Sequence, residues 1–215
     1  MSPSQSVRSA LRWRVPISDQ EFDALYPEHI RLLSNVHWTP VEVALRAAAL
    51  LVPEPGMKVL DVGSGAGKVC CIGAVSSRST WHGIERDPRL VSTARRMAKN
   101  LEVDDRAHFH IGDMATVDWA EFDSIYFFNP FERLLFAPPP IEPRLRWTLF
   151  GNEVSRAEER LAALAPGTRV VTYHGFGGEM PASYKLSGME RIGSDQLALW
   201  IKKPNAPASR LPQPA

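Results

Sequence analysis

Cysteine is scarce in this chain, and the two that occur, Cys70 and Cys71, are adjacent. Two neighbouring cysteines exclude a disulfide framework and a zinc site of the CxxC type, so we expect both to be core residues. Apolar runs are short, and none reaches the roughly 18 residues of a membrane-spanning helix, nor do the first residues contain the apolar centre of a secretory signal. We therefore expect a soluble, cytoplasmic protein without a membrane partner.

The chain also lacks an excess of either charge, because it contains 25 basic and 24 acidic residues and has a formal net charge of +1. This balance argues against the broadly basic surface that drives general nucleic-acid binding. His108 and His110 share one face of an expected strand, but no third ligand lies near them in the sequence, so no metal is expected. With 215 residues, 44% of them hydrophobic, one substantial core is expected. The sequence does not specify the oligomeric state.

What the chain does contain is a glycine-rich stretch after an apolar run, from Val59 through Asp61 to Gly63, Gly65 and Gly67. This pattern predicts the first strand of an α/β sheet followed by a cofactor-binding loop and a helix. Lys68 occupies the position where a dinucleotide fingerprint needs its last glycine, and the residue after Lys68 is not the Ser or Thr of a phosphate-binding loop. Neither NAD nor ATP is therefore favoured.

Three further expected strands each end in a polar residue. The first of these strands, 80–85, ends in Glu85, where a parallel α/β unit places a carboxylate that accepts hydrogen bonds from ribose hydroxyls. The next, 107–111, precedes Asp113, and a strongly strand-like run over 122–128 ends in Asn129. The glycine loop and these strand ends follow one another in a fixed order along the chain, and their combination is more specific than any one of them.

Together these features resemble the class I S-adenosylmethionine-dependent methyltransferases, whose first motif is D-x-G-x-G-x-G. The resemblance implies a seven-stranded, mostly parallel, doubly wound α/β sheet with helices on both faces and the last strand antiparallel. It also implies S-adenosyl-L-methionine as cofactor and S-adenosyl-L-homocysteine as product. The cofactor-binding residues that it implies are Trp38, Thr39, Asp61, Gly63, Ser64, Gly65, Gly67, Glu85, Arg86, Asp113, Met114 and Asn129. Among them, Glu85 corresponds to the ribose ligand, Asp113 to the acceptor for the adenine amino group, and the Met114 amide to the contact with the ring.

The segments DVGSGAGKV, GIERD and IYFFNPF are similar to the core of the non-SET histone-lysine methyltransferase family. That family has two asparagines before the phenylalanine, where this chain has Asn129-Pro130, so a histone substrate does not carry over. Nucleobase amino-methyltransferases have [DN]PP[YF] at this place, and the chain, with NPFE, lacks the second proline. On the acceptor side we expect Asn129 and the Pro130 carbonyl as hydrogen-bond partners and Phe131 as a packing surface.

The chain is expected to divide into an N-terminal arm and helical cap over 1–38, a methyltransferase domain over 39–203 and a flexible tail over 204–215. Residues 1–18 are expected to be irregular, and Thr39 is expected to cap a helix that ends near residue 51. Residues 131–150 are read as a long substrate lid before a helix over 153–164.

The predicted function is methyl transfer to an unidentified acceptor, an amine of a small molecule or of a protein lysine. Tyr26, His37, Trp38 and His174 are candidate walls of the acceptor pocket. Two alternatives stay open: an inactive cofactor-binding module that supports a partner protein, and a nucleic-acid methyltransferase.

Overall fold

A single seven-stranded sheet forms the centre of the protein. The computed structural model describes residues 1–32, 38–136 and 142–205, and its strands lie in the order β3-β2-β1-β4-β5-β7-β6. The strands are β1 (Lys58–Val62), β2 (Thr80–Glu85), β3 (Ala107–Ile111), β4 (Ser124–Phe128), β5 (Arg169–Tyr173), β6 (Tyr184–Ile192) and β7 (Asp195–Lys202). β1 to β5 pair in parallel, whereas β7 is antiparallel to both of its neighbours. The predicted architecture is confirmed.

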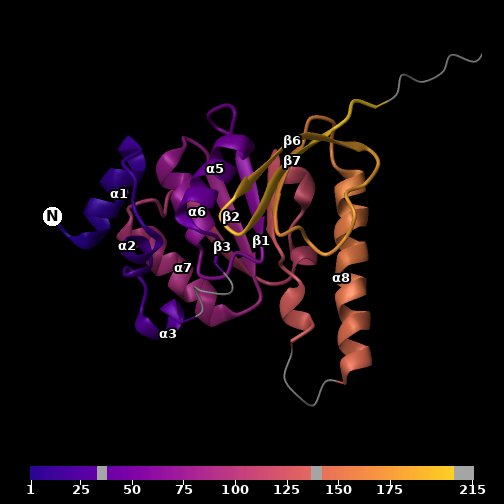
Figure 1. Cartoon of the computed structure of the whole chain (residues 1–215), viewed down its shortest axis with the longest axis horizontal. Helices are drawn as coiled ribbons and strands as arrows, with labels where there is room; N and C mark the ends of the chain where they lie inside the picture. The colour runs from indigo at the N-terminus through magenta and orange to yellow at the C-terminus, as the bar shows by residue number, and fades with distance from the viewer. Residues whose placement is uncertain (33–37, 137–141, 206–215) are drawn as a thin grey trace, which may run out of the picture.

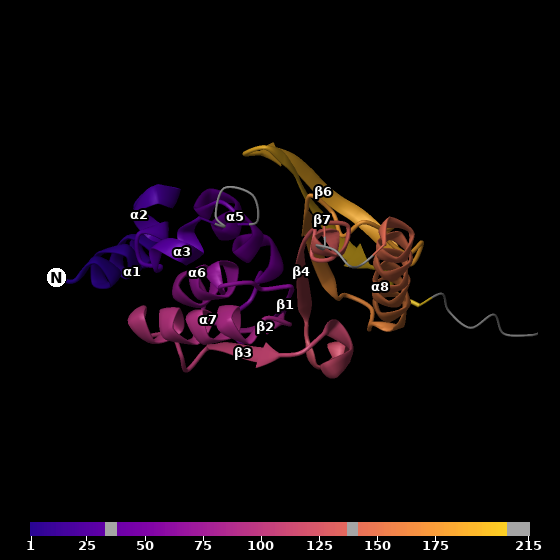
Figure 2. The same ribbon diagram turned by 90° about the horizontal axis from the view of Figure 1, so that it is seen from below.

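Helices cover both faces of this sheet (Figures 1 and 2). They are α1 (Pro3–Trp13), α2 (Asp19–Asp23), α3 (Glu28–Arg31), α5 (Val41–Leu51), α6 (Lys68–Ser76), α7 (Pro88–Asn100) and α8 (Pro143–Ala163), with short 3-10 helices η1 (Met114–Thr116), η2 (Trp119–Glu121) and η3 (Glu132–Leu134). α5, α6 and α7 lie on one face with α1 to α3 outside them, and α8 lies on the opposite face (Figure 2).

The alternation of side chains along each strand divides the core into two hydrophobic clusters. In β1, Val59 joins the cluster beneath α5, α6 and α7, and its neighbour Leu60 joins the cluster beneath α8. Successive strand residues point to opposite faces, so each strand that is apolar throughout is buried from both sides. Cys70 and Cys71 are fully buried in the first cluster and form no disulfide, as expected for core residues.

The N-terminal segment is helical, which corrects the expectation of an irregular start over residues 1–18. Ser2 accepts from the amide of Gln5, whose side chain accepts in return from the amide of Ser2, so a complete capping box precedes α1. Val7 and Leu11, four residues apart, are buried in the cluster beneath α6. The capping box and this spacing were present in the sequence and were missed.

The start of α5 also differs from the prediction. Thr39 does not cap this helix; its hydroxyl lies 2.9 Å from the Tyr126 hydroxyl in β4. Pro40 occupies the N-cap position without a side-chain hydrogen bond, and the Val41 amide donates to Asp19 Oδ1 at 2.8 Å. A carboxylate from α2 therefore accepts a hydrogen bond from an otherwise unpaired amide at the start of α5. No local motif could have predicted this contact.

The connection after β4 is shorter than the 131–150 segment that was expected to form a lid. Three residues separate η3 from the end of β4, and α8 begins at Pro143, ten residues before the helix expected at 153. Proline suits the first turn of a helix, where its missing N–H costs no hydrogen bond. Residues 137–141 of the expected lid lie outside the described residues, as do residues 206–215 of the expected tail.

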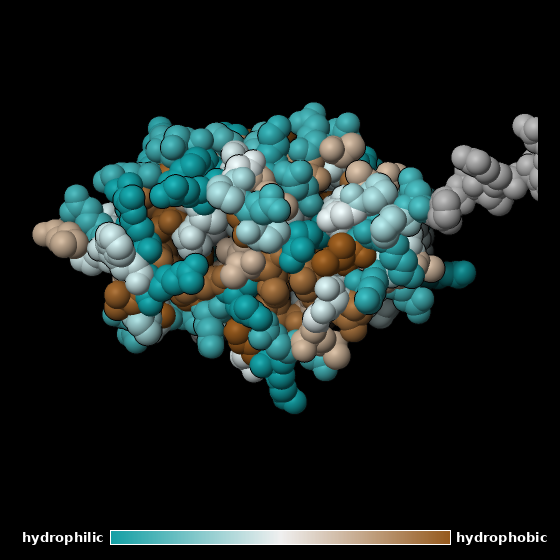
Figure 3. All heavy atoms as spheres, turned by 90° about the horizontal axis from the view of Figure 1, so that it is seen from above, coloured by the Kyte–Doolittle hydropathy of each residue, from teal (hydrophilic) through white to brown (hydrophobic). Residues whose placement is uncertain are grey.

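The surface is mixed in character. The face in Figure 3 is mostly hydrophilic, with apolar side chains gathered in a few patches. Within the described residues, no helix is both long and apolar enough to cross a membrane.

Candidate functional site

The glycine loop after β1 lies against the carboxyl ends of β2 and β4. The Gly65 amide donates to Glu85 Oε2 at 3.1 Å, and the other oxygen of Glu85 accepts from the Asp87 amide at 2.9 Å. Ser64 turns inward beneath the loop, and its hydroxyl oxygen is buried without a hydrogen-bond partner among the described residues. A Cβ on Gly65 would meet no atom within 4 Å, so the outer side of the loop is open.

Two glycines of the loop are required by close contacts. Gly63 has φ +78°, and a Cβ there would lie 2.9 Å from Pro130 Cβ, so the loop and the strand end at Asn129-Pro130 are in contact. Gly67 has φ +82°, and a Cβ there would lie 2.7 Å from both Ala94 and the Phe109 ring. Glycine alone fits these positions without strain. The structure thus brings together two motifs that are more than sixty residues apart in the sequence.

Asp61 lies beneath the loop and is only 4% exposed. Burial raises the pKa of Asp61 to about 7; the Cys70 thiol, whose Sγ lies 3.5 Å from Oδ2, lowers it, and the negative charge of Glu85 adds to the rise. Asp61 is therefore a buried group at the base of the loop, and its carboxylate does not reach the open side.

A third acidic position lies at the end of β3. Asp113 accepts from the Ala115 amide at 2.7 Å and caps η1, while its second oxygen lies 3.8 Å from Arg86. Arg86 also lies 2.9 Å from Glu153 of α8, a partner that the sequence did not suggest. The Met114 side chain is buried in the cluster beneath α8, so only the backbone of Met114 is available to a ligand.

Asn129 sits at the end of β4 in an unusual backbone conformation. Its φ is +39°, its amide donates to the Gly175 carbonyl at 2.9 Å, and its side chain lines a cavity. Phe131 is 6% exposed and packs in the cluster beneath α8, outside the set of cavity-lining residues. The aromatic ring that does line the cavity is Phe128, the last residue of β4.

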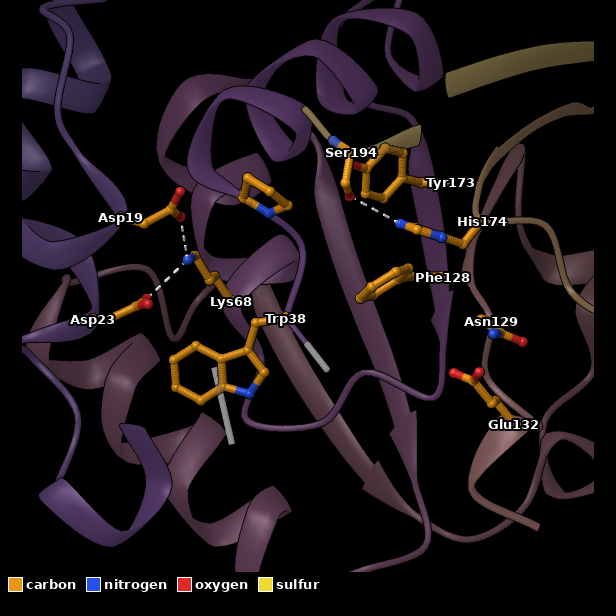
Figure 4. A pocket seen from close by; sticks show the side chains of 11 residues that line it. Asp19, Asp23, Trp38, Lys68, Phe128, Asn129, Glu132, Tyr173, His174 and Ser194 are labelled. Atoms are coloured by element: carbon orange, nitrogen blue, oxygen red, sulfur yellow. Dashed lines mark hydrogen bonds and ion pairs between the residues drawn. The ribbon is translucent and has the colours of Figure 1, made fainter. Parts of the chain in front are cut away.

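The cavity has a volume of about 500 Å³ and lies between the N-terminal helices and the ends of β4 and β5 (Figure 4). It is lined by Asp19, Asp23, Trp38, Pro40, Lys68, Phe128, Asn129, Glu132, Tyr173, His174 and Ser194. Of the four pocket walls expected from the sequence, Trp38 and His174 line it. Tyr26 is instead buried, and its hydroxyl donates to the Ala66 carbonyl at 3.1 Å; His37 lies outside the described residues.

One wall of the cavity is an ion cluster around the buried ammonium group of Lys68. The Lys68 ammonium lies 2.6 Å from Asp19 Oδ1 and 2.8 Å from Asp23 Oδ1, and it sits over the rings of Phe22 and Trp38. From the sequence, Lys68 was expected only to exclude a dinucleotide-binding loop. Asp19 and Asp23 were available as an i, i+4 acidic pair on one helix face, but their partner could not be read from the sequence.

The carboxyl group of Glu132 is opposite this ion cluster. Glu132 lines the cavity from η3, and its side chain forms no ion pair or hydrogen bond within the described residues. Among those residues there is no group of three His, Cys, Asp or Glu side chains that could hold a metal ion. The groups that line the cavity are carboxylates, an ammonium, aromatic rings, hydroxyls, an amide and an imidazole.

Comparison with known proteins gives the same architecture. A family model described as a methyltransferase domain matches residues 53–172. The release factor glutamine methyltransferase of Chlorobaculum tepidum is 32% identical over 123 residues, which are 56% of this chain and 40% of that protein. The uncharacterized protein YjhP of Escherichia coli K12 is 37% identical over 62 residues, 29% of this chain and 25% of that protein. The chain thus spans less than half the length of these curated relatives.

Among solved structures, an RNA methyltransferase from Salinibacter ruber in complex with S-adenosyl-L-homocysteine superposes with a TM-score of 0.53 at 24% identity, covering 78% of this chain and 93% of that one. This likeness is one of fold. The family model covers more than half of the chain, from the turn before β1 to the end of β5, and includes the glycine loop, Glu85, Asp113 and Asn129. The chain therefore belongs to the methyltransferase domain family and has the class I S-adenosylmethionine-dependent fold.

Proposed function

We propose that this protein transfers a methyl group from S-adenosylmethionine to an amine, of either a small molecule or a lysine side chain, which binds as its ammonium ion and reacts after losing a proton. The observation that carries the proposal is the Glu132 carboxylate, which has no ion-pair or hydrogen-bond partner in the described parts of the chain and lies in a cavity that Asn129 also lines. Among the described residues, the cavity wall holds the carboxylates of Asp19, Asp23 and Glu132, and the Lys68 ammonium pairs with the two aspartates. The Glu132 carboxylate therefore adds a negative charge that favours a cationic ligand.

The open rim of the glycine loop fits the cofactor. Gly65 has free space on its outer side, and the Glu85 carboxylate beside it keeps lone pairs for ribose hydroxyls. Asp113 and the Met114 amide would hold the adenine, with Arg86 beside them, while Trp38, Thr39 and Asn129 would enclose the methionine end. When bound, S-adenosylmethionine supplies an electrophilic methyl group on a sulfonium sulfur.

The residues of the cavity would orient the acceptor. Glu132 would attract the ammonium group, and the rings of Trp38 and Phe128 provide faces over which a cation is stabilised. Asn129 and the Pro130 carbonyl would then hold the amine through hydrogen bonds. Bringing the amine into line with the methyl group, away from bulk water, is the main contribution that such a site makes to the rate.

Calorimetry with S-adenosylhomocysteine tests the cofactor site. We expect Glu85→Gln to weaken binding by about tenfold to a hundredfold, because it removes charge-assisted hydrogen bonds. Glu54→Gln, at an exposed residue of the turn before β1, should bind as the wild type does. Wild-type binding that Glu85→Gln leaves unchanged would contradict the assignment of Glu85.

Transfer of a labelled methyl group tests the acceptor. A lysate treated with the protein and S-[methyl-³H]adenosylmethionine is divided into small-molecule, protein and nucleic-acid fractions, and we expect label on amines in one of the first two. Asn129→Ala should lose transfer even when S-adenosylmethionine is saturating. Label in nucleic acid would favour the alternative substrate class, and binding without any transfer would favour an inactive module.

A further inference from the structure

A chain of hydrogen-bonding groups forms the cavity wall opposite Lys68. Asp195 Oδ2 lies 2.6 Å from His174 Nδ1, and the Ser194 hydroxyl lies 3.3 Å from His174 Nε2. The Tyr173 hydroxyl is 3.2 Å from the Ser194 hydroxyl and accepts from the Ser194 amide at 3.1 Å. Figure 4 shows Tyr173, His174 and Ser194 on the same side of the cavity as Phe128.

An unusual backbone conformation orients the His174 imidazole. His174 follows β5 directly and has φ +57°, a left-handed conformation that costs a non-glycine residue about 1–2 kcal/mol. Antiparallel pairing of β5 with β7 brings the turn before β7 to the same edge, with Tyr173 opposite Leu197. Residues from two distant segments thus fix the His174 ring, which also lies 5.3 Å from the Phe128 ring.

The contact with Asp195 determines which ring nitrogen is free. A carboxylate accepts at Nδ1, so a neutral His174 carries its proton on Nδ1 and keeps the lone pair on Nε2. The groups that face this ring are Asp195 on β7, the hydroxyls of Tyr173 and Ser194, and, across the cavity, Glu132 and the Lys68 cluster. Only the serine hydroxyl is within hydrogen-bonding distance of Nε2 among the described residues, and this exposed hydroxyl can donate instead to the Tyr173 hydroxyl, 3.2 Å away.

We propose that His174 Nε2 accepts the proton that the ammonium form of the acceptor must lose before methyl transfer. This inference rests on the proposed function. The N–H bond of the ammonium breaks, its electron pair stays on nitrogen, and the proton forms a bond with Nε2. The amine nitrogen then forms its bond to the methyl carbon while the carbon–sulfur bond breaks and its electron pair goes to sulfur.

Asp195 acts in this step as a positioning residue. Its carboxylate holds the ring and stabilises the imidazolium that forms, as a carboxylate does beside other histidine bases. The His174 side chain is 33% exposed, so the accepted proton can pass to water after each turnover. A histidine that only pins the turn before β7 would have the same contacts, and the experiment must therefore separate the two roles.

The first measurement needs neither cofactor nor turnover. Long-range ¹H–¹⁵N spectra of histidine-labelled protein report the tautomer of each ring, and the signal missing from His174→Gln assigns His174. We expect the Nδ1–H tautomer in the wild-type protein, and a shift toward the Nε2–H tautomer in Asp195→Asn. A wild-type His174 with its proton on Nε2 would overturn the proposal, whatever the activity.

The second measurement uses phenethylamine and Nα-acetyl-lysine as methyl acceptors. We expect His174→Ala to lower kcat by about a hundredfold or more with S-adenosylhomocysteine affinity unchanged, and added imidazole to restore part of the rate. His29→Gln, at an exposed histidine of α3, is the matched control and should keep the wild-type rate.

The outcomes distinguish the two proposals. If the wild-type protein methylates a probe and His174→Ala retains its rate, or loses it without rescue by imidazole, the proton-transfer role is wrong and the amine acceptor stands. If the wild-type protein binds S-adenosylhomocysteine but methylates neither probe and labels no amine in the lysate, the amine acceptor is wrong, and with it the role of His174 in deprotonating one.

Discussion

Lys68 and Asp19 join the N-terminal helices to the glycine loop. The Lys68 ammonium donates to Asp19 Oδ1 at 2.6 Å, and the same oxygen accepts from the Val41 amide at 2.8 Å. One carboxylate oxygen therefore connects α2, the start of α5 and the start of α6. Because Lys68 directly follows Gly67, this contact fixes the N-terminal helices next to the expected cofactor loop and forms one wall of the cavity.

Lys68→Met should destabilise the protein by about 3 kcal/mol, because it leaves Asp19 and the more deeply buried Asp23 without their shared counter-ion. Urea denaturation measures the change. Arg46→Ala, which breaks the exposed pair with Glu190, is the control and should cost less than about 1 kcal/mol. Equal losses in the two variants would show that the Lys68 cluster contributes no more than a surface pair.

Gly67→Ala should cost about 3 kcal/mol, since the new Cβ combines a left-handed φ with contacts of 2.7 Å to Ala94 and Phe109. Gly167→Ala is the matched control, because Gly167 has φ +87° but no atom within 4 Å of an added Cβ, and we expect about 1 kcal/mol there. Thermal and urea unfolding of both variants give the difference. Similar losses would mean that the loop relaxes away from α7 and β3.

The raised pKa of Asp61 predicts that the free energy of unfolding decreases as pH rises. Its pKa is raised to about 7 by burial, above the ordinary value near 4, so the unfolded chain loses this proton first and stability falls as pH rises through the interval. We expect Asp61→Asn to remove this dependence, with a gain over the wild type that is larger at pH 8 than at pH 4 by on the order of 3 kcal/mol. A difference that does not change with pH would contradict the raised pKa.

The lowered pKa of His82 predicts the opposite pH dependence, in which the free energy of unfolding increases as pH rises. Burial, together with the nearby His108 and His110, lowers the pKa of His82 to about 4, and its Nδ1 lies 3.2 Å from His110 Nε2. The unfolded chain therefore binds this proton more readily, and stability falls as pH decreases from about 6.5 to 4. We expect His82→Gln to reduce that loss by roughly 1 kcal/mol, since water screens this half-buried ring. Urea midpoints at the two ends of the interval, compared with those of His29→Gln, provide the measurement.

Local sequence determined much of the fold and of the cofactor side of the site. The apolar runs that became β1 to β4 and the glycine spacing are short-range signals with direct physical meanings. The same signals placed Glu85 and Asp113 at strand ends. Where local signals were present but overlooked, as in the capping box at Ser2, the expectation of an irregular segment was wrong.

Tertiary structure alone decided the composition of the cavity. Lys68 pairs with Asp19 and Asp23, and His174 pairs with Asp195. These residues are far apart in the sequence, so local patterns do not indicate that they are in contact. Phe128 lines the cavity and Phe131 is buried because the chain turns sharply at Asn129, where φ is positive. The sequence thus determined the methyltransferase fold and its glycine loop, because these follow from local propensities and spacing. The lining of the cavity depends on long-range packing, which short-range patterns along the chain do not reveal.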